Sequence, residues 1–105
     1  MKAIHLKSMK PGVALVTGGS KRIGRSIIKK LSSLGWKVII HYNSNKVDAL
    51  SLQKEIQKNG GSVSIIKANL NSPKATKELI AKSEKKFGKL TLLVNQFLKM
   101  TQLKA

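Results

Sequence analysis

The feature that most constrains the fold of this chain is a glycine-rich segment between a short apolar run and an amphipathic stretch. The apolar run, residues 13–16, reads Val-Ala-Leu-Val and is bounded by Pro-Gly before it and Gly-Gly after it. Such a short, continuous run is typical of a parallel strand that is buried on both faces. Beyond the glycines, one helical stripe is formed by Ile23, Ile27, Ile28, Leu31 and Leu34. Gly35 stands where a helix-ending glycine belongs. The pattern predicts a strand, a tight turn and a helix.

The rest of the chain repeats this alternation of strand and helix. Strands are predicted at residues 38–42, 63–68 and 90–95, and helices at residues 47–58 and 73–87. Ser72 followed by Pro73 is a helix-start signal. Because parallel strands joined by right-handed crossovers wind in one direction, the predicted strands, numbered along the chain, form a sheet in the order 3-2-1-4. This α/β arrangement places a ligand crevice between the first and fourth strands.

The glycine-rich segment itself has the composition of an anion-binding turn. It reads Thr-Gly-Gly-Ser-Lys-Arg-Ile-Gly over residues 17–24. Glycines allow bare backbone to approach an anion, and the first amides of the following helix point at it. The alternative is a plain strand-to-helix turn. The position of the segment, directly between a buried strand and an amphipathic helix, favours a phosphate or pyrophosphate site.

Four segments, in order, resemble the short-chain dehydrogenase/reductase family. The first segment, residues 17–24, has Thr-Gly, then three residues, then Arg-Ile-Gly. It resembles the family's fingerprint in the form seen in pteridine reductases, with Arg22 in place of the usual middle glycine. Residues 41–44, His-Tyr-Asn-Ser, resemble the pteridine reductase segment after the second strand. Residues 69–70, Asn-Leu, stand where the family has Asp and an apolar residue beside the adenine. Residues 93–95 resemble the start of its Leu-Val-Asn-Asn-Ala stretch.

This resemblance implies a truncated, partial Rossmann fold in residues 13–95 that binds NADP, between an N-terminal tail, residues 1–12, and a divergent C-terminal tail, residues 96–105. The implied cofactor-binding residues are Gly18, Lys21, Arg22, Ile23, Gly24, His41, Tyr42, Asn43, Ser44, Asn69, Leu70 and Asn95. NADPH is expected over NADH because no carboxylate ends the second strand. The sequence departs from the family's pattern at two positions. Asn69 keeps an acceptor oxygen but lacks the charge of Asp, and Phe97 would crowd the ribose and nicotinamide path.

The residues that carry catalysis in this family are not expected in the chain. The family's proton donor is a Tyr with a Lys four residues on, downstream of the dinucleotide-binding half. The sole tyrosine, Tyr42, has Lys46 at that spacing but lies at the end of the second strand. We expect a truncated reductase that is inactive alone, with NADPH as its ligand. It is a decayed gene product, an excised piece, or half of a split enzyme completed by another chain.

The charge leaves a second class of function open. The chain has 21 Lys and Arg against 4 Asp and Glu, a net charge of +17, which attracts polyanions. The alternative function is therefore a small cationic module that binds nucleic acid or another polyanion. All basic residues except Arg22 and Arg25 are scattered lysines, as an AT-rich genome would produce. We therefore do not expect nucleic acid as the partner.

Three further expectations follow from composition and strand order. No apolar run approaches the ~18 residues of a membrane span, and no signal-like stretch begins the chain, so a cytoplasmic protein without a membrane partner is predicted. No cysteine is present, and His5 and His41 are isolated, so no metal site is predicted. Finally, residues 90–94 would form an unpaired sheet edge, which predicts marginal stability and self-association.

Overall fold

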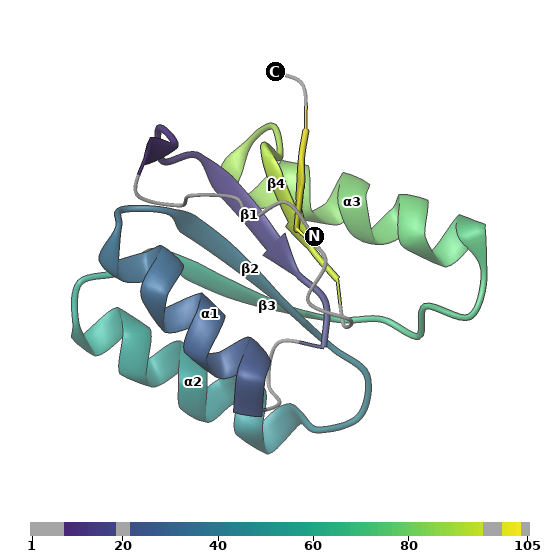
Figure 1. Cartoon of the computed structure of the whole chain (residues 1–105). Helices are drawn as coiled ribbons and strands as arrows, with labels where there is room; N and C mark the ends of the chain where they lie inside the picture. Colours follow the sequence, from purple (N-terminus) through teal and green to yellow (C-terminus); the bar gives the residue numbers. More distant parts are fainter. Residues whose placement is uncertain (1–7, 19–21, 96–99, 104–105) are drawn as a thin grey trace.

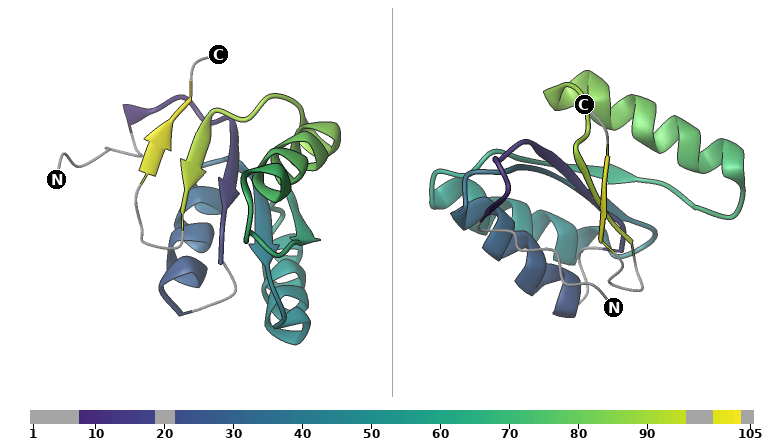
Figure 2. Two further views of the ribbon diagram at one scale, coloured as in Figure 1. Left: turned by 90° about the vertical axis from the view of Figure 1, so that its right-hand side faces the viewer. Right: turned by 45° about the horizontal axis from the view of Figure 1, so that its top comes forward.

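The computed structural model describes residues 8–18, 22–95 and 100–103, without the side chains of Arg22 and Ile23. These residues form a sheet with helices on both faces (Figure 1). The strands are β1 (Val13–Val16), β2 (Lys37–Tyr42), β3 (Val63–Lys67), β4 (Leu92–Val94) and β5 (Met100–Gln102). The helices are α1 (Arg22–Ser33), α2 (Lys46–Lys58) and α3 (Pro73–Phe87). Helices α1 and α2 cover one face of the sheet, and α3 covers the other (Figure 2).

The strand order confirms the predicted topology. The described residues form a five-stranded sheet in the order β3-β2-β1-β4-β5. Strands β1 to β4 are parallel, and Val16 at the end of β1 is in register with Ile40 on one side and Val94 on the other. The parallel strands therefore bring their carboxyl ends to one edge of the sheet, where the sequence predicted the ligand crevice.

The prediction that residues 90–94 form an unpaired edge is wrong. Strand β5 pairs antiparallel with β4, with Val94 opposite Met100 and Leu92 opposite Gln102. An antiparallel neighbour needs only a short connection, whereas a parallel one needs a long crossover. Three residues are too few to show a strand periodicity, so residues 100–102 were predicted as part of the C-terminal tail, residues 96–105. Among the described residues, the outermost strands are β3 and β5.

Each face of the sheet has its own apolar core because side chains alternate between the faces of a strand. On the side of α1 and α2, Ile28 and Leu31 pack with Trp36, Ile40 and Leu52. On the side of α3, a smaller cluster joins Val13, Leu15, Ile39, Leu79 and Leu90. The two cores hold the strands' carboxyl ends in fixed positions relative to one another.

The predicted helix signals are confirmed at both ends of the fold. Gly35 follows α1 with a φ of 93°, a conformation that favours glycine. Its N–H donates to the Ser32 carbonyl at 3.0 Å, and the Trp36 N–H donates to the Leu31 carbonyl at 3.1 Å, the two bonds of a Schellman motif. At the start of α3, Ser72 Oγ accepts the Ala75 N–H at 3.2 Å.

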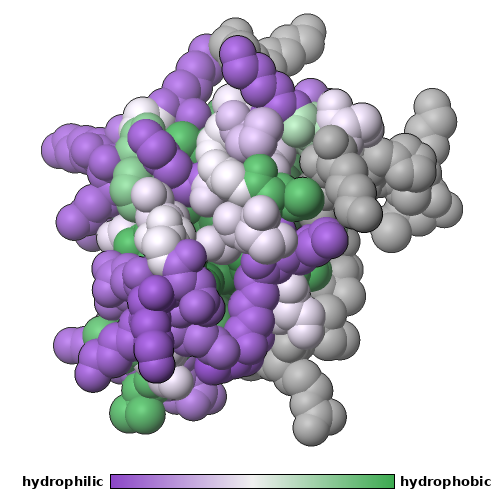
Figure 3. Space-filling view, turned by 90° about the vertical axis from the view of Figure 1, so that its left-hand side faces the viewer, coloured by the Kyte–Doolittle hydropathy of each residue, from purple (hydrophilic) through white to green (hydrophobic). Residues whose placement is uncertain are grey.

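Lysines are spread over the surface. Exposed lysines lie on all three helices of the described chain. The face on the left of Figure 1 is largely hydrophilic, with hydrophobic side chains in small, separate groups (Figure 3). The basic residues are thus spread over several elements and not confined to one.

Candidate functional site

A pocket of about 450 Å³ lies at the carboxyl ends of the parallel strands, on the side of the sheet that α3 covers. Polar side chains from the segments that follow the strands meet apolar side chains of the sheet and of α3. The pocket is lined by Leu15, Thr17, His41, Asn43, Ala68, Asn69, Leu70, Asn71, Thr76, Leu79, Ile80, Leu93 and Asn95. It therefore occupies the predicted crevice beside the glycine-rich turn.

The turn after β1 begins with two consecutive backbone amides that bond inside the protein. The Thr17 N–H donates to the Val94 carbonyl at 2.9 Å, which keeps the chain attached to β4. The next amide, of Gly18, donates to Nδ1 of His41 at 2.9 Å. Gly18 has a φ of 64°, in the left-handed region where glycine is favoured. The chain thus turns away from the sheet at a glycine whose amide is fixed by a side chain of β2.

His41 connects two strand ends through its ring. Its side chain is buried, with the residue 5% exposed. Because Nδ1 accepts a backbone N–H, Nε2 carries the proton and donates to the Ala68 carbonyl at 2.7 Å. Burial lowers the pKa of His41, and the hydrogen bond to Ala68 opposes this shift in part. The ring is therefore neutral at neutral pH and ties the turn after β1 to the segment after β3.

The structure brings about half of the predicted cofactor-binding residues together. His41, Asn43, Asn69, Leu70 and Asn95 line the pocket. Gly18 joins them through its bond to His41. Gly24 lies in the first turn of α1. Lys21 and the side chains of Arg22 and Ile23 lie outside the described residues.

Two of the residues predicted at the end of β2 and directly after it do not line the pocket. Tyr42 follows His41 in β2, so its side chain points to the opposite face of the sheet, where it is buried. Ser44 is exposed and is not part of the pocket wall. Tyr42 is also separated from β4 by β1, as predicted from the strand order.

Sequence reasoning missed the contribution of α3. Thr76 and Ile80 lie one turn apart on this helix and both face the pocket. No residue of the predicted helix 73–87 was expected to contact the ligand. Thr76, four residues before Ile80, was the available signal that this face of the helix reaches a polar cavity. Asn71, directly after the Asn69-Leu70 segment, was missed as well.

The pocket has no negative charge among its described residues. None of the lining residues is ionised at neutral pH. Asp48, the acid nearest in sequence to the end of β2, lies in the first turn of α2, where its Oδ2 accepts Asn45 Nδ2 at 2.6 Å and its N–H donates to Asn45 Oδ1 at 3.3 Å. Its carboxylate is thus held in the helix cap.

Two other kinds of site were sought in the same part of the chain. No cluster of three or more His, Cys, Asp or Glu residues that could hold a metal occurs among the described residues. Over the same ranges, no helix has the length and apolar character needed to cross a membrane.

A mostly parallel sheet in this order, with a glycine turn after β1 and a pocket at the carboxyl ends, defines a doubly wound α/β fold. The family model described as short chain dehydrogenase matches residues 12–96. The chain belongs to this family. The resemblance to short-chain dehydrogenases/reductases is therefore confirmed.

Curated relatives are similar over most of this chain. A 3-oxoacyl-[acyl-carrier-protein] reductase from Synechocystis sp. is 35% identical over 83 residues, 79% of this chain and 34% of the relative. A reductase of the same name from Staphylococcus epidermidis is 38% identical over 82 residues, 78% of this chain and 34% of the relative. The chain spans about a third of the length of these relatives.

Solved structures agree with this assignment. The FolM alternative dihydrofolate reductase 1 from Brucella canis, complexed with NADP, has a TM-score of 0.71 and 31% identity, covering 77% of this chain and 32% of that protein. A dehydrogenase/reductase from Sinorhizobium meliloti has a TM-score of 0.79 and 32% identity, covering 86% of this chain and 36% of that protein. Both similarities are to part of a longer chain.

Proposed function

We propose that this chain binds NADP(H) at the carboxyl edge of its sheet, as the cofactor-binding portion of a short-chain dehydrogenase/reductase. The observation that carries the proposal is the pocket beside the Gly18 turn, with asparagines from the ends of three different strands in its wall. Family membership and the NADP complex of a similar protein support it. A dinucleotide is long enough to contact all of these strand ends.

Asn69 and Asn95 would serve different parts of the cofactor. Asn69 lies at the end of β3, next to Leu70, where an amide oxygen can accept the adenine amino group and the apolar side chain can contact the base. Asn95 lies at the end of β4, on the other side of β1. The adenosine would thus bind over β2 and β3, and the nicotinamide toward β4.

The preference for NADP over NAD would come from a missing carboxylate. An NAD site has an acid after the second strand that holds the ribose 2′-hydroxyl and repels a 2′-phosphate. In the described part of this site that position offers Asn43 and Ser44 instead, and Asp48 is held in the cap of α2. Lys21 and Arg22 of the glycine-rich segment would supply positive charge to the phosphate.

We assign the substrate class as a pterin. The Arg-Ile-Gly and His-Tyr-Asn-Ser segments resemble pteridine reductases. The similar FolM protein, a dihydrofolate reductase by its name, supports this class. The reductases of 3-oxoacyl groups among the relatives make an acyl thioester the competing substrate.

The proton donor of the reaction would come from outside this sequence. Tyr42 is buried on the face opposite the pocket, and Lys46 is exposed at the start of α2. A proton donor must lie within hydrogen-bond reach of the acceptor atom of the substrate. The chain by itself would hold the cofactor without transferring hydride, and a second chain carrying Tyr-x-x-x-Lys would complete the site.

A calorimetric titration of variants tests the proposal. Arg22→Ala should weaken NADP⁺ binding by about tenfold or more, because a charge-assisted hydrogen bond to phosphate is lost. Lys58→Ala, at the exposed end of α2, removes the same charge away from the pocket and should change the affinity by less than about twofold. Equal affinities in the two variants would contradict the phosphate role of Arg22.

An activity assay tests the catalytic part separately. NADPH oxidation, followed by nicotinamide absorbance with dihydrobiopterin, folate and quinones, should be absent for the chain alone. Turnover that copurifies with the chain and disappears in Tyr42→Phe would contradict the proposal. Turnover that requires an added chain with Tyr-x-x-x-Lys would support it.

A cationic binding module remains the second candidate, because the net charge is +17 and exposed lysines lie on all three helices. Binding of that kind weakens steeply as salt is raised, since counterions are released from the polyanion. NADP⁺ binding that saturates at one site, with a shallower salt dependence than duplex DNA binding, favours the cofactor function.

A further inference from the structure

We propose that His41 is a positioning residue that fixes Gly18, at the start of the glycine-rich segment, by accepting its N–H and donating to the Ala68 carbonyl. The inference rests on the proposed NADP(H) function, but it gives His41 a role different from the one expected from sequence. From sequence, His41 was expected among the cofactor-binding residues. In the structure both ring nitrogens already have partners inside the protein.

The start of the turn after β1 is anchored to both neighbouring strands. Thr17 is bonded to Val94 of β4, and Gly18 to His41 of β2, so two consecutive amides point to opposite neighbours of β1. Without the second bond, the turn would be held on one side only. The Gly18 amide also cannot serve a phosphate, because its hydrogen is used by His41. Its bond instead ties Gly18 to β2.

The same ring also bonds to the opposite wall of the pocket. Nε2 of His41 is 2.7 Å from the carbonyl of Ala68, the residue before Asn69. One ring thus couples the turn after β1 to the segment after β3, which carries the residues proposed to contact the adenine. A shift of the ring would move both walls of the pocket together.

The position of His41 requires one acceptor and one donor on the same small group. A neutral imidazole provides both, and so does the amide of Gln or Asn, whereas Lys and Arg only donate and a carboxylate only accepts. The ring is buried, so loss of a partner leaves a buried polar group unsatisfied. Phenylalanine keeps the ring shape and removes both bonds.

Protonation of His41 would break this arrangement. An imidazolium carries hydrogen on both nitrogens, so Nδ1 would face the Gly18 N–H as a second donor. Strand β1 carries no charged residue. In the described part of the site, the residues from β4, β3 and α3 that face the pocket are uncharged as well. The charged residues nearest in sequence on β3 and α3 are Lys67, Lys77 and Glu78, and all three are exposed. Burial, which lowers the pKa of His41, is therefore the dominant influence.

The test compares His41→Phe and His41→Gln in NADP⁺ titrations between about pH 5 and pH 8. At the upper end, His41→Phe should weaken binding about tenfold, since the buried Gly18 N–H loses its acceptor, and His41→Gln should stay within about threefold of the wild type. As the pH falls, wild-type affinity should drop below that of His41→Gln. The 2′-phosphate titrates equally in both proteins, so the difference between the two profiles isolates His41.

A second readout does not depend on the cofactor. In the ligand-free protein, ¹⁵N NMR should show protonated Nε2 and bare Nδ1 on His41, with slow hydrogen exchange at Gly18 that becomes fast in His41→Phe. This result supports the positioning role even if the wild-type protein fails to bind NADP⁺. Such a failure would contradict the proposed function but not the positioning role of His41. A protonated Nδ1 at neutral pH would overturn the inference. So would matching affinities of His41→Gln and His41→Phe, or matching pH profiles of His41→Gln and wild type.

Discussion

Val94 of β4 and Met100 of β5 are register partners in an antiparallel ladder, so the chain covers the strand that its sequence would leave open. The ladder extends to Leu103, whose N–H donates to the Thr91 carbonyl at 2.9 Å. Strand β5 is short, and its residues are half-buried or exposed. Protection of β4 thus depends mainly on backbone hydrogen bonds.

Leu103→Pro should therefore increase self-association. Proline removes the N–H that bonds to Thr91, at a cost of about 1–3 kcal/mol, and leaves β4 available to a second copy. Leu103→Ala is the matched control, because it loses the side chain packed against the α3 core but keeps the N–H. Light scattering after size-exclusion chromatography should show more oligomer for the proline variant. Equal monomer fractions would contradict a protective role of β5.

Asn43→Asp should change the cofactor preference. Asn43 lines the pocket after β2, and a carboxylate there would repel the 2′-phosphate of NADP⁺ while it could accept the ribose hydroxyl of NAD⁺. We expect NADP⁺ affinity to fall at least about tenfold and NAD⁺ affinity to hold or rise. Asn43→Ala controls for loss of the amide. A parallel fall for both cofactors would mean that Asn43 does not discriminate between them.

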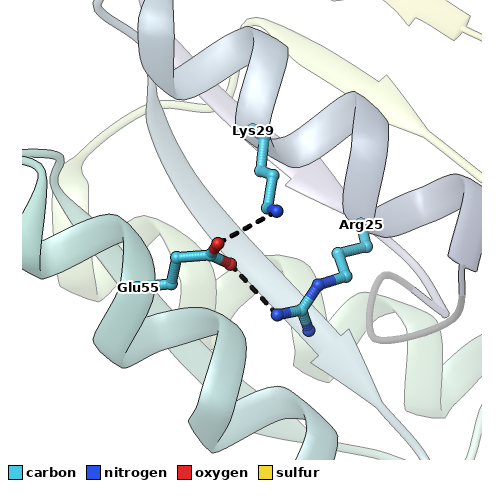
Figure 4. A network of polar contacts seen from close by, with 3 residues as sticks. All are labelled: Arg25, Lys29 and Glu55. Atoms are coloured by element: carbon cyan, nitrogen blue, oxygen red, sulfur yellow. Dashed lines mark hydrogen bonds and ion pairs between the residues drawn. The ribbon is translucent and has the colours of Figure 1, made fainter.

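The ion pairs between α1 and α2 should make a pH-dependent contribution to stability. Glu55 accepts Arg25 Nη2 and Lys29 Nζ, each at 3.0 Å (Figure 4). These cations, with the Lys29 hydrogen bond as the largest cause, lower the pKa of Glu55 below its ordinary 4.5. The contribution is therefore present above pH 4.5 and is lost as the pH falls through the folded-state pKa. Urea unfolding should give Glu55→Gln a lower free energy of unfolding than wild type at neutral pH. A difference that persisted in acid would exclude the ion pairs as its cause.

Trp36 should tolerate loss of its indole N–H. The residue is 1% exposed, and its Nε1 has no hydrogen-bond partner among the described residues. Removing an unpaired buried donor recovers about 1–3 kcal/mol. This gain offsets part of the free-energy cost of the cavity that the smaller phenyl ring leaves. Trp36→Phe should therefore cost less than about 2 kcal/mol, whereas Trp36→Ala should cost about 3–5 kcal/mol. Comparable losses for both in thermal or urea unfolding would show that the N–H is satisfied in solution.

Sequence alone predicted the elements whose signals are local. The run at Val13, the Ser72-Pro73 start and the Gly35 end each depend on neighbouring residues, and the structure confirms all three. The order of β1 to β4 followed from the handedness of crossovers. Strand β5 could not be predicted in this way, because a three-residue strand is stabilised by pairing and has no periodicity of its own.

The candidate site was predicted by position but not by role. Of the residues predicted at the ends of strands, Asn69 and Asn95 line the pocket on the side of α3, and their role in cofactor binding stays a prediction. Tyr42 was included from the resemblance, although alternation along β2 points it and His41 to opposite faces. The bonds of His41 to Gly18 and Ala68 join residues 23 and 27 positions away, a relationship that no local pattern contains.

Direct calorimetric comparison of NADP⁺ and NAD⁺ on the wild-type chain at neutral pH and moderate salt tests the central claim. The pocket and the missing carboxylate predict one saturable NADP⁺ site per chain, with NADP⁺ binding at least about tenfold more tightly than NAD⁺ because the 2′-phosphate adds charge-assisted hydrogen bonds. Equal or tighter binding of NAD⁺, or no saturable binding of either dinucleotide, would contradict the account.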